Sequence, residues 1–317
     1  MLYPFCDKWN IRYKRTGKWI VAQNDEESDY LQKMYNRETE RDLYFLSSEQ
    51  IKQEPNVKAK HALCSPRTGI IDSHGLMNAF RNIIQDSEHS QIITRTNVIS
   101  IIKDTHGYII TAQCDGDLIK VRANTLVNSA GLNAQGICQM VFQRKLPKQY
   151  QTYFYKGQYF SYSNPHASPL VSRLIYPVPD PNLSKGLGTH ATIDLNGKVR
   201  FGPDSHFIGD FDSCSRLDYS VNNQDAKSFA ENIQKYLHIN PLALSADYSG
   251  VRPRLQAPGQ PQCDFYIHDE SEQGFPGFIN LLGIESPGLT SCLPIANYVS
   301  SLLNYSQKNN FKMYTTS

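Results

Sequence analysis

The chain has 317 residues, of which 32 are basic and 30 acidic, for a formal net charge of +2. This length allows two domains with a sizeable core. The balanced charge, without a basic run, argues against nucleic-acid binding, and no apolar segment reaches the roughly 18–20 residues of a membrane span.

The first ninety residues predict short strands alternating with helices. We expect a turn and a short strand around Gly17, a surface helix over 25–46 and a short helix from Ser47. A turn, a short strand and a cap are expected over 68–73. A helix follows, with one apolar face made by Leu76, Ala79, Phe80 and Ile83.

From residue 91 the apolar residues alternate, which is typical of strands. Four strand-like segments lie at 92–94, 97–102, 108–113 and 117–121, and Gly107 and Gly116 supply hairpin signals between the last three. This pattern predicts a small antiparallel meander. A strand over 125–131 follows, ending in small residues, and then a helix from about Ala134.

The second half of the chain predicts more strands. A tyrosine-rich strand is expected over 150–165, and Asn196-Gly197 predicts a type I′ hairpin between 188–195 and 198–202. A helix over 224–238 and a short strand at 247–254, stopped by Pro253, follow.

The stretch 278–303 reads as a buried strand, a glycine-rich turn and a helix. Ser286 is expected to cap this helix and Pro287 to occupy its first position. The backbone N–H groups at such a turn, with the helix dipole, suit an anion or an electron-rich ring. An ordinary strand-to-helix connection is the alternative.

The exact residue sequences of several stretches are more specific than their predicted secondary structure. The segment Phe278-Ile279-Asn280-Leu281-Leu282-Gly283-Ile284-Glu285-Ser286-Pro287-Gly288-Leu289-Thr290 resembles the flavin-contacting segment of FAD-dependent oxidoreductases of the D-amino-acid oxidase type, and it is most similar to their L-2-hydroxyglutarate dehydrogenase branch. Further stretches resemble the same branch in the same order: residues 65–72, 127–132, 155–160, 174–180, 186–195, 200–204 and 250–253.

The resemblance implies an α/β fold with two parts. An incomplete, Rossmann-like FAD-binding domain would take residues 61–145 and 245–317, and a substrate domain with a mixed or antiparallel sheet would take 1–60 and 146–244. FAD is the implied cofactor. The residues implied to contact it are Val98, Ala130, Gly131, Gly283, Ile284, Glu285, Ser286, Pro287, Gly288, Leu289 and Thr290.

One motif resembles a phosphate-binding loop but lies in the wrong structural context. Residues 186–191 match G-x-G-x-x-A, but a proline-rich loop precedes them and a strand follows, so they fail as a phosphate-binding loop. The resembling enzymes begin with a βαβ unit of about 30 residues that carries this loop. The chain is therefore expected to lack the N-terminal dinucleotide-binding segment, as an incomplete gene model, a fragment or a real short form.

Three side chains are candidates for the chemistry. By resemblance, Arg252 would hold a substrate carboxylate, which suits a guanidinium fork, with a surface salt bridge as the alternative. His190 would take the hydroxyl proton, or would be a histidine bonded within the sheet. By resemblance, Lys156 would steer a dianion or balance the charge of the flavin; the alternative is a lysine that simply faces solvent. Arg254 shares a face with Arg252 and would bind a second carboxylate or face solvent.

The expected reaction is oxidation of L-2-hydroxyglutarate to 2-oxoglutarate, with hydride passing to flavin N5 and electrons leaving to an unknown acceptor. A flavin amino-acid oxidase and a non-catalytic relative acting as a binding module are the alternatives. The seven scattered cysteines predict free thiols, and the remaining histidines predict no metal site. The resemblance implies a mitochondrial location in a eukaryote and otherwise a cytoplasmic one. The sequence shows no presequence pattern.

Overall fold

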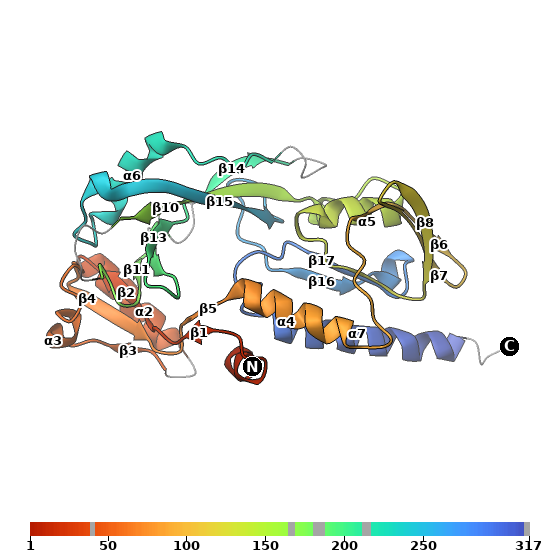
Figure 1. The fold of residues 1–317 in the computed structure, drawn as a ribbon, viewed down its shortest axis with the longest axis horizontal. Helices are drawn as coiled ribbons and strands as arrows, with labels where there is room; N and C mark the ends of the chain where they lie inside the picture. Colours follow the sequence, from red (N-terminus) through yellow and green to blue (C-terminus); the bar gives the residue numbers. More distant parts are fainter. Residues whose placement is uncertain (39–41, 164–168, 180–187, 211–216, 314–317) are drawn as a thin grey trace.

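The computed structural model is elongated, with a large sheet at one end and two smaller sheets at the other (Figure 1). It describes residues 1–38, 42–163, 169–179, 188–210 and 217–313. Strands β10 and β15 run along one side of the molecule and extend toward the smaller sheets, and helices α4 and α7 lie along the opposite side (Figure 1).

The large sheet has nine strands in the order β14-β10-β13-β12-β11-β2-β4-β3, with β15 paired to β10. Pairing is antiparallel except between β2 and β11, which makes the sheet mixed. The bounds are β2 (Lys18–Ala22), β3 (Tyr44–Phe45), β4 (His61–Ser65), β10 (Tyr153–Tyr162), β11 (Leu174–Pro177), β12 (His190–Ile193), β13 (Val199–Gly202), β14 (His206–Gly209) and β15 (Leu244–Arg254).

Register across this sheet separates a core face from a second face. One row of partners, all buried, runs through Trp19, Ile175, Ala191, Phe201 and Phe160. Helix α6 (Ala226–Ile233) packs on this row through Phe229 and Ile233. Because side chains alternate along a strand, the neighbouring row faces the other way and carries Ile20, Tyr176, His190, Gly202 and Tyr159.

Helix α2 (Asp25–Arg37) covers one end of that second face, where its Leu31 packs against Ile20 and Leu63. Asn24 caps α2 by accepting a hydrogen bond from the Glu27 N–H, and three acidic residues follow in the first turn. Two of the polar candidates, His190 and Arg252, lie on the rest of the second face, over β12 and β15.

The other end of the molecule holds the meander β6-β7-β8 and the sheet β16-β17-β9. Helix α5 (Ala134–Phe142) packs between them, in a core with Tyr108 and Phe278. A buried polar network links the sheet to this core, since Asn280 bonds both Asn128 and Glu270. The strand bounds are β6 (Thr96–Asp104), β7 (Gly107–Cys114), β8 (Asp117–Ala123), β9 (Leu126–Asn128), β16 (Tyr266–Asp269) and β17 (Phe278–Leu282).

Helices α1 (Leu2–Lys8), α4 (Ser73–Gln85) and α7 (Cys292–Met313) meet in a further cluster through Cys6, Leu76 and Cys292. Short elements complete the chain: β1 (Tyr13–Lys14) paired with β5 (Ile70–Ile71), and α3 (Ser48–Ile51), which a capping box at Ser47 begins.

The α/β fold class with a mixed sheet is confirmed. The division at residues 60, 145 and 245 stays a prediction. Within the ranges assigned to the FAD part, however, β4 and β15 pair with strands of the large sheet. A strand's assignment follows its hydrogen-bonded partner, which the linear sequence does not reveal.

Several element predictions are confirmed. The meander, the strand over β17, the helix from Ala134 and the strand–hairpin–strand unit of β12 and β13 all form. Six cysteines lie in the described part of the chain, and all six are free. The strand that begins at His190 confirms that no helix follows the G-x-G-x-x-A motif, whose Gly186 and Leu187 lie outside the described residues.

Other predictions are wrong. Residues 92–94 form no strand, because no partner strand pairs with them. The helix predicted over 25–46 ends at Arg37, and Tyr44–Phe45 instead pair with β4. Strand β15 continues through Pro253, opposite Phe154, which an edge strand tolerates.

Two turn predictions also need correction. The hairpin at Asn196-Gly197 is not type I′, because only Gly197 has a positive φ. The Asp194 carboxylate shapes this turn instead by accepting hydrogen bonds from the N–H groups of Asn196 and Lys198. Helix α7 begins at Cys292, so Ser286 does not cap it and Pro287 is not its first residue.

Candidate functional site

Two of the predicted cofactor segments meet at one edge of the β16-β17-β9 sheet. Strands β9 and β17 run parallel, with Asn128 opposite Asn280. Their carboxyl ends therefore lie at the same edge, which is where open α/β sheets bind ligands. Ala130 and Gly131 follow β9 at this edge, and the turn that begins at Gly283 follows β17.

The turn from Gly283 to Thr290 has hydrogen-bond donors for a ligand, and the neighbouring Gly131 has open space beside it. The Gly288 N–H donates to the Glu285 carbonyl at 2.5 Å. The N–H groups of Leu289 and Thr290 find no acceptor among the residues that the structure describes. Gly131 has a φ of +58° and nothing within 4 Å of where a Cβ would stand, so the edge is open beside it.

Val98 is placed differently from the other predicted cofactor residues. It lies in β6, in the meander, and packs against the core that contains Phe278. The register of β6 against β7 shifts just after it, between Val98 and Ser100.

His190 lies on the second face of the large sheet and is buried, with 7% of its surface exposed. Its Nδ1 lies 3.2 Å from the Gly188 carbonyl oxygen. Because a carbonyl only accepts, Nδ1 carries the proton and Nε2 keeps a lone pair. Burial is the main cause that lowers the pKa of His190 from 6.5 to about 4, and the nearby cations Arg252 and Lys18 contribute to the same shift. The imidazole is therefore neutral at pH 7.

Two tyrosines lie in the same cross-strand row as His190. The Tyr176 ring stacks on it, with centroids 3.9 Å apart. Gly202 is its register partner, and a Cβ there would meet the Tyr159 ring at 2.8 Å, so Tyr159 packs directly on this glycine. Tyr159 stacks in turn on Tyr248, with centroids 4.6 Å apart. The absence of a side chain at Gly202 thus leaves space for the Tyr159 ring in the row of His190.

Arg252 and Arg254 converge on one carboxylate. The Arg252 Nη1 lies 3.3 Å from Glu285 Oε2, and the Arg254 Nε lies 3.1 Å from Glu285 Oε1. The Glu285 side chain is 7% exposed. This contact joins the edge of β15 to the turn after β17, so the predicted carboxylate-binding arginine already holds a carboxylate of the chain itself.

Lys156 is not brought together with His190 and Arg252. Tyr155 is the register partner of Arg252, whereas Lys156 is opposite Val251. Partners in register share a face, so Lys156 points to the other face of the sheet. There its ammonium pairs with Asp218 at 3.0 Å.

Sequence reasoning missed four side chains: Glu285 as an ion-pair partner, and Tyr159, Tyr176 and Lys18 as neighbours of His190. The alternation of tyrosines along 153–159 was a usable signal for Tyr159. The signal for Lys18 was its place directly before the apolar run Trp19–Ala22, because a lysine stem beside apolar residues is rarely exposed along its whole length.

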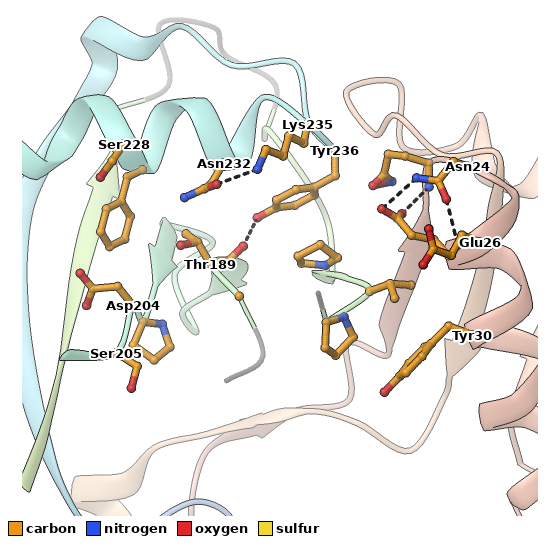
Figure 2. Close-up of a pocket in the computed structure, with 18 of the residues that line it drawn as sticks. Asn24, Glu26, Tyr30, Thr189, Asp204, Ser205, Ser228, Asn232, Lys235 and Tyr236 are labelled. Carbon is orange, nitrogen blue, oxygen red and sulfur yellow. Dashed lines mark hydrogen bonds between the residues drawn. The ribbon is translucent and has the colours of Figure 1, made fainter. Parts of the chain in front are cut away.

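A cavity of about 740 Å³ opens between α2 and α6, beyond the ends of β11, β12 and β13. Figure 2 shows its lining, where the Tyr236 hydroxyl donates to the Thr189 carbonyl at 3.0 Å. Asp204, Tyr30 and Lys235 also line it. Neither His190 nor Arg252 does, so this cavity is separate from the cluster on the second face.

The described part of the chain contains neither a metal-binding cluster nor a membrane-spanning helix. No group of three or more histidine, cysteine, aspartate or glutamate side chains is arranged to hold a metal ion there. Nor is any described helix both long and apolar enough to cross a membrane.

Comparisons with known proteins agree on one family. A family model described as FAD dependent oxidoreductase matches residues 2–302. The mitochondrial L-2-hydroxyglutarate dehydrogenase of Arabidopsis thaliana is 32% identical over 95% of this chain and 69% of its own length. The L-2-hydroxyglutarate dehydrogenase of Escherichia coli K12 is 25% identical over 94% of this chain and 75% of its own length.

The fold agrees as well. L-alpha-glycerophosphate oxidase from Mycoplasma pneumoniae, solved with FAD bound, superposes with a TM-score of 0.71 at 22% identity, over 93% of this chain and 74% of that one. FAD is the cofactor of this family, and the free N–H groups of Leu289 and Thr290 with the open space at Gly131 fit an electron-rich group. The chain belongs to the FAD-dependent oxidoreductase family.

Proposed function

We propose that the protein oxidises an L-2-hydroxy acid to the 2-oxo acid, and that L-2-hydroxyglutarate is the substrate. One observation carries the proposal: a neutral histidine with a free Nε2 lies on the same sheet face as Arg252. The identity to two L-2-hydroxyglutarate dehydrogenases supports the choice of substrate.

In this proposal Arg252 orients the substrate through its carboxylate. A guanidinium binds a carboxylate with two parallel hydrogen bonds, which fixes direction as well as position. When the substrate carboxylate binds Arg252, it replaces Glu285 there, and Glu285 stays paired with Arg254, whose contact is the shorter of the two. Glu285 then acts as a positioning residue between β15 and the turn after β17.

His190 takes the proton of the substrate hydroxyl at Nε2. The hydrogen bond from Nδ1 to Gly188 fixes the ring orientation and the tautomer. A positioned base of this kind contributes about 10²- to 10⁴-fold in rate. When bound, FAD supplies the acceptor for the hydride that leaves the same carbon. Ala130, Gly131 and the turn 283–290 are the residues that we propose to hold it, with Val98 near its adenine.

The similarity to these dehydrogenases also suggests where in the cell the protein is located. The Arabidopsis and Caenorhabditis elegans relatives are named as mitochondrial enzymes, which supports a mitochondrial location for this chain in a eukaryotic cell.

The test is an anaerobic titration of the FAD-loaded protein, followed by the loss of flavin absorbance. L-2-hydroxyglutarate should bleach the flavin, whereas its D enantiomer should not. Arg252→Lys should lose most of the bleaching, at least about tenfold in rate at low substrate, because an ammonium cannot copy the bidentate contact. Arg81→Lys, on the exposed side of α4, is the matched control.

Other outcomes would refute the proposal. Bleaching by L-glutamate but not by the hydroxy acid would make the protein an amino-acid oxidase. Bound FAD that no hydroxy acid or amino acid reduces would make it a non-catalytic relative that acts as a binding module.

A further inference from the structure

The face of the large sheet that carries His190 also carries a lysine that has no acidic partner among the described residues. Lys18 begins β2, and its ammonium lies 5.0 Å from the centre of the Tyr176 ring. The same ring stacks on His190. Burial lowers the pKa of Lys18, and no carboxylate among the described residues offsets this effect. A buried cation without a counter-charge is costly unless a ligand supplies one.

Lys18 and Arg252 stand on opposite sides of His190. The strand order β15-β10-β13-β12-β11-β2 puts the histidine strand between the other two. Arg252 is opposite Tyr155, four residues along β10 from Tyr159, so the two cations also differ in position along the strands. Both still lie near enough to His190 to lower its pKa.

A diacid can offer one carboxylate to each cation. In a five-carbon diacid the two carboxyl carbons are roughly 5 Å apart when extended, and a charge-assisted hydrogen bond at each end adds about 2.8 Å.

Neutral hydroxyl donors line the space between the two cations. The hydroxyl groups of Tyr159 and Tyr176 have no hydrogen-bond partner among the described residues. Burial raises the pKa of Tyr159 to about 12 and raises the pKa of Tyr176 as well, so both remain donors at neutral pH. Cations and neutral donors together favour a ligand that carries negative charge at both ends.

Charge balance in the bound state leads to the same conclusion. A substrate with a single carboxylate would neutralise Arg252 and leave the Lys18 ammonium without a counter-charge. A second acidic group on the substrate supplies that counter-charge.

We infer that Lys18, held on the Tyr176 ring, is the specificity-determining residue that binds the second carboxylate of the substrate, at the end away from Arg252. This inference rests on the proposed function and adds to it a reason for selecting a dicarboxylate. It assigns Lys18 to binding and selectivity, not to the hydride or proton transfer.

The experiment compares two substrates and two variants. L-2-hydroxyglutarate and L-2-hydroxyvalerate have the same five carbons, but the second has a methyl group in place of the distal carboxylate. Lys18→Met keeps an unbranched apolar stem on Tyr176 and removes the charge, and Lys18→Arg keeps the charge. Lys14→Met, on the exposed strand β1, is the control.

The expected result is a change in KM that is confined to the dicarboxylate. Lys18→Met should raise its KM about 10- to 100-fold, the effect of losing one charge-assisted hydrogen bond. Its kcat should stay within about threefold, and kinetics with L-2-hydroxyvalerate should not change. Lys18→Arg should restore most of the KM. Binding of glutarate, measured by calorimetry, should weaken by the same factor without any turnover.

Two failures can be told apart. If the wild type prefers L-2-hydroxyglutarate and Lys18→Met keeps that preference with unchanged glutarate binding, the inference is overturned and the proposed function stands. If the wild type oxidises neither hydroxy acid, the proposed function fails and this inference fails with it.

Discussion

The burial of His190 predicts a specific loss of stability in mild acid. In the unfolded chain a histidine has a pKa near 6.5, whereas burial lowers the pKa of His190 in the folded protein to about 4. Between these two values the unfolded chain binds a proton that the folded protein does not. Stability therefore falls as the pH decreases from 6.5 to about 4, and the loss levels off below that.

The size of the loss follows from the same two values. At about 1.4 kcal/mol per pH unit between them, His190 costs the folded state about 3 kcal/mol by pH 4. Carboxylates also titrate in this range, so the wild type must be compared with His190→Gln, which cannot be charged. The free energy of unfolding would be measured in urea at several pH values from 7 to 4.

The expected outcome is that the wild type loses about 3 kcal/mol more than His190→Gln over this interval. His89→Gln, a similar change at an exposed position, should follow the wild type. Equal pH dependence of the wild type and His190→Gln would refute the reasoning. It would mean that water or a rearranged neighbour solvates the imidazolium, and that the neutral base assigned to the site is wrong.

Two further predictions concern the turn after β17. Gly283→Ala should destabilise the protein by at least about 1 kcal/mol more than Gly259→Ala. Both glycines have a positive φ, but only at position 283 would a Cβ meet a side chain, which is that of Leu255 at 2.7 Å. Equal urea midpoints for the two variants would contradict this. Glu285→Gln should cost about 1–3 kcal/mol of unfolding free energy by removing the counter-charge of two arginines, and an unchanged midpoint would show that the carboxylate is not needed there.

Local patterns were enough to predict much of the fold. The alternation over 97–121, with glycines between the segments, predicted the β6-β7-β8 meander, because hairpins are built from neighbours in sequence. The apolar run 278–282 predicted the buried strand β17. Where a segment's backbone partner lies far away in sequence, the same reasoning failed, as for Tyr44–Phe45, which pair with β4 rather than extending α2.

The same distinction between local and long-range information applies to the candidate site. The motifs around Arg252, His190 and the turn from Gly283 identified the family and named candidate residues, because they are short and local. Periodicity within one strand could not show that Lys156 and Arg252 lie on opposite faces, since that depends on how β10 pairs with β15.

The sequence by itself therefore determined the family, the cofactor and the α/β class of this protein. Only the tertiary structure decided that Glu285 holds both arginines, that Tyr176 joins Lys18 to His190, and that the ends of β9 and β17 form one edge. The physical reason is that register between strands distant in sequence is set by packing of the whole core, and a shift of one residue would turn each of these side chains to the opposite face.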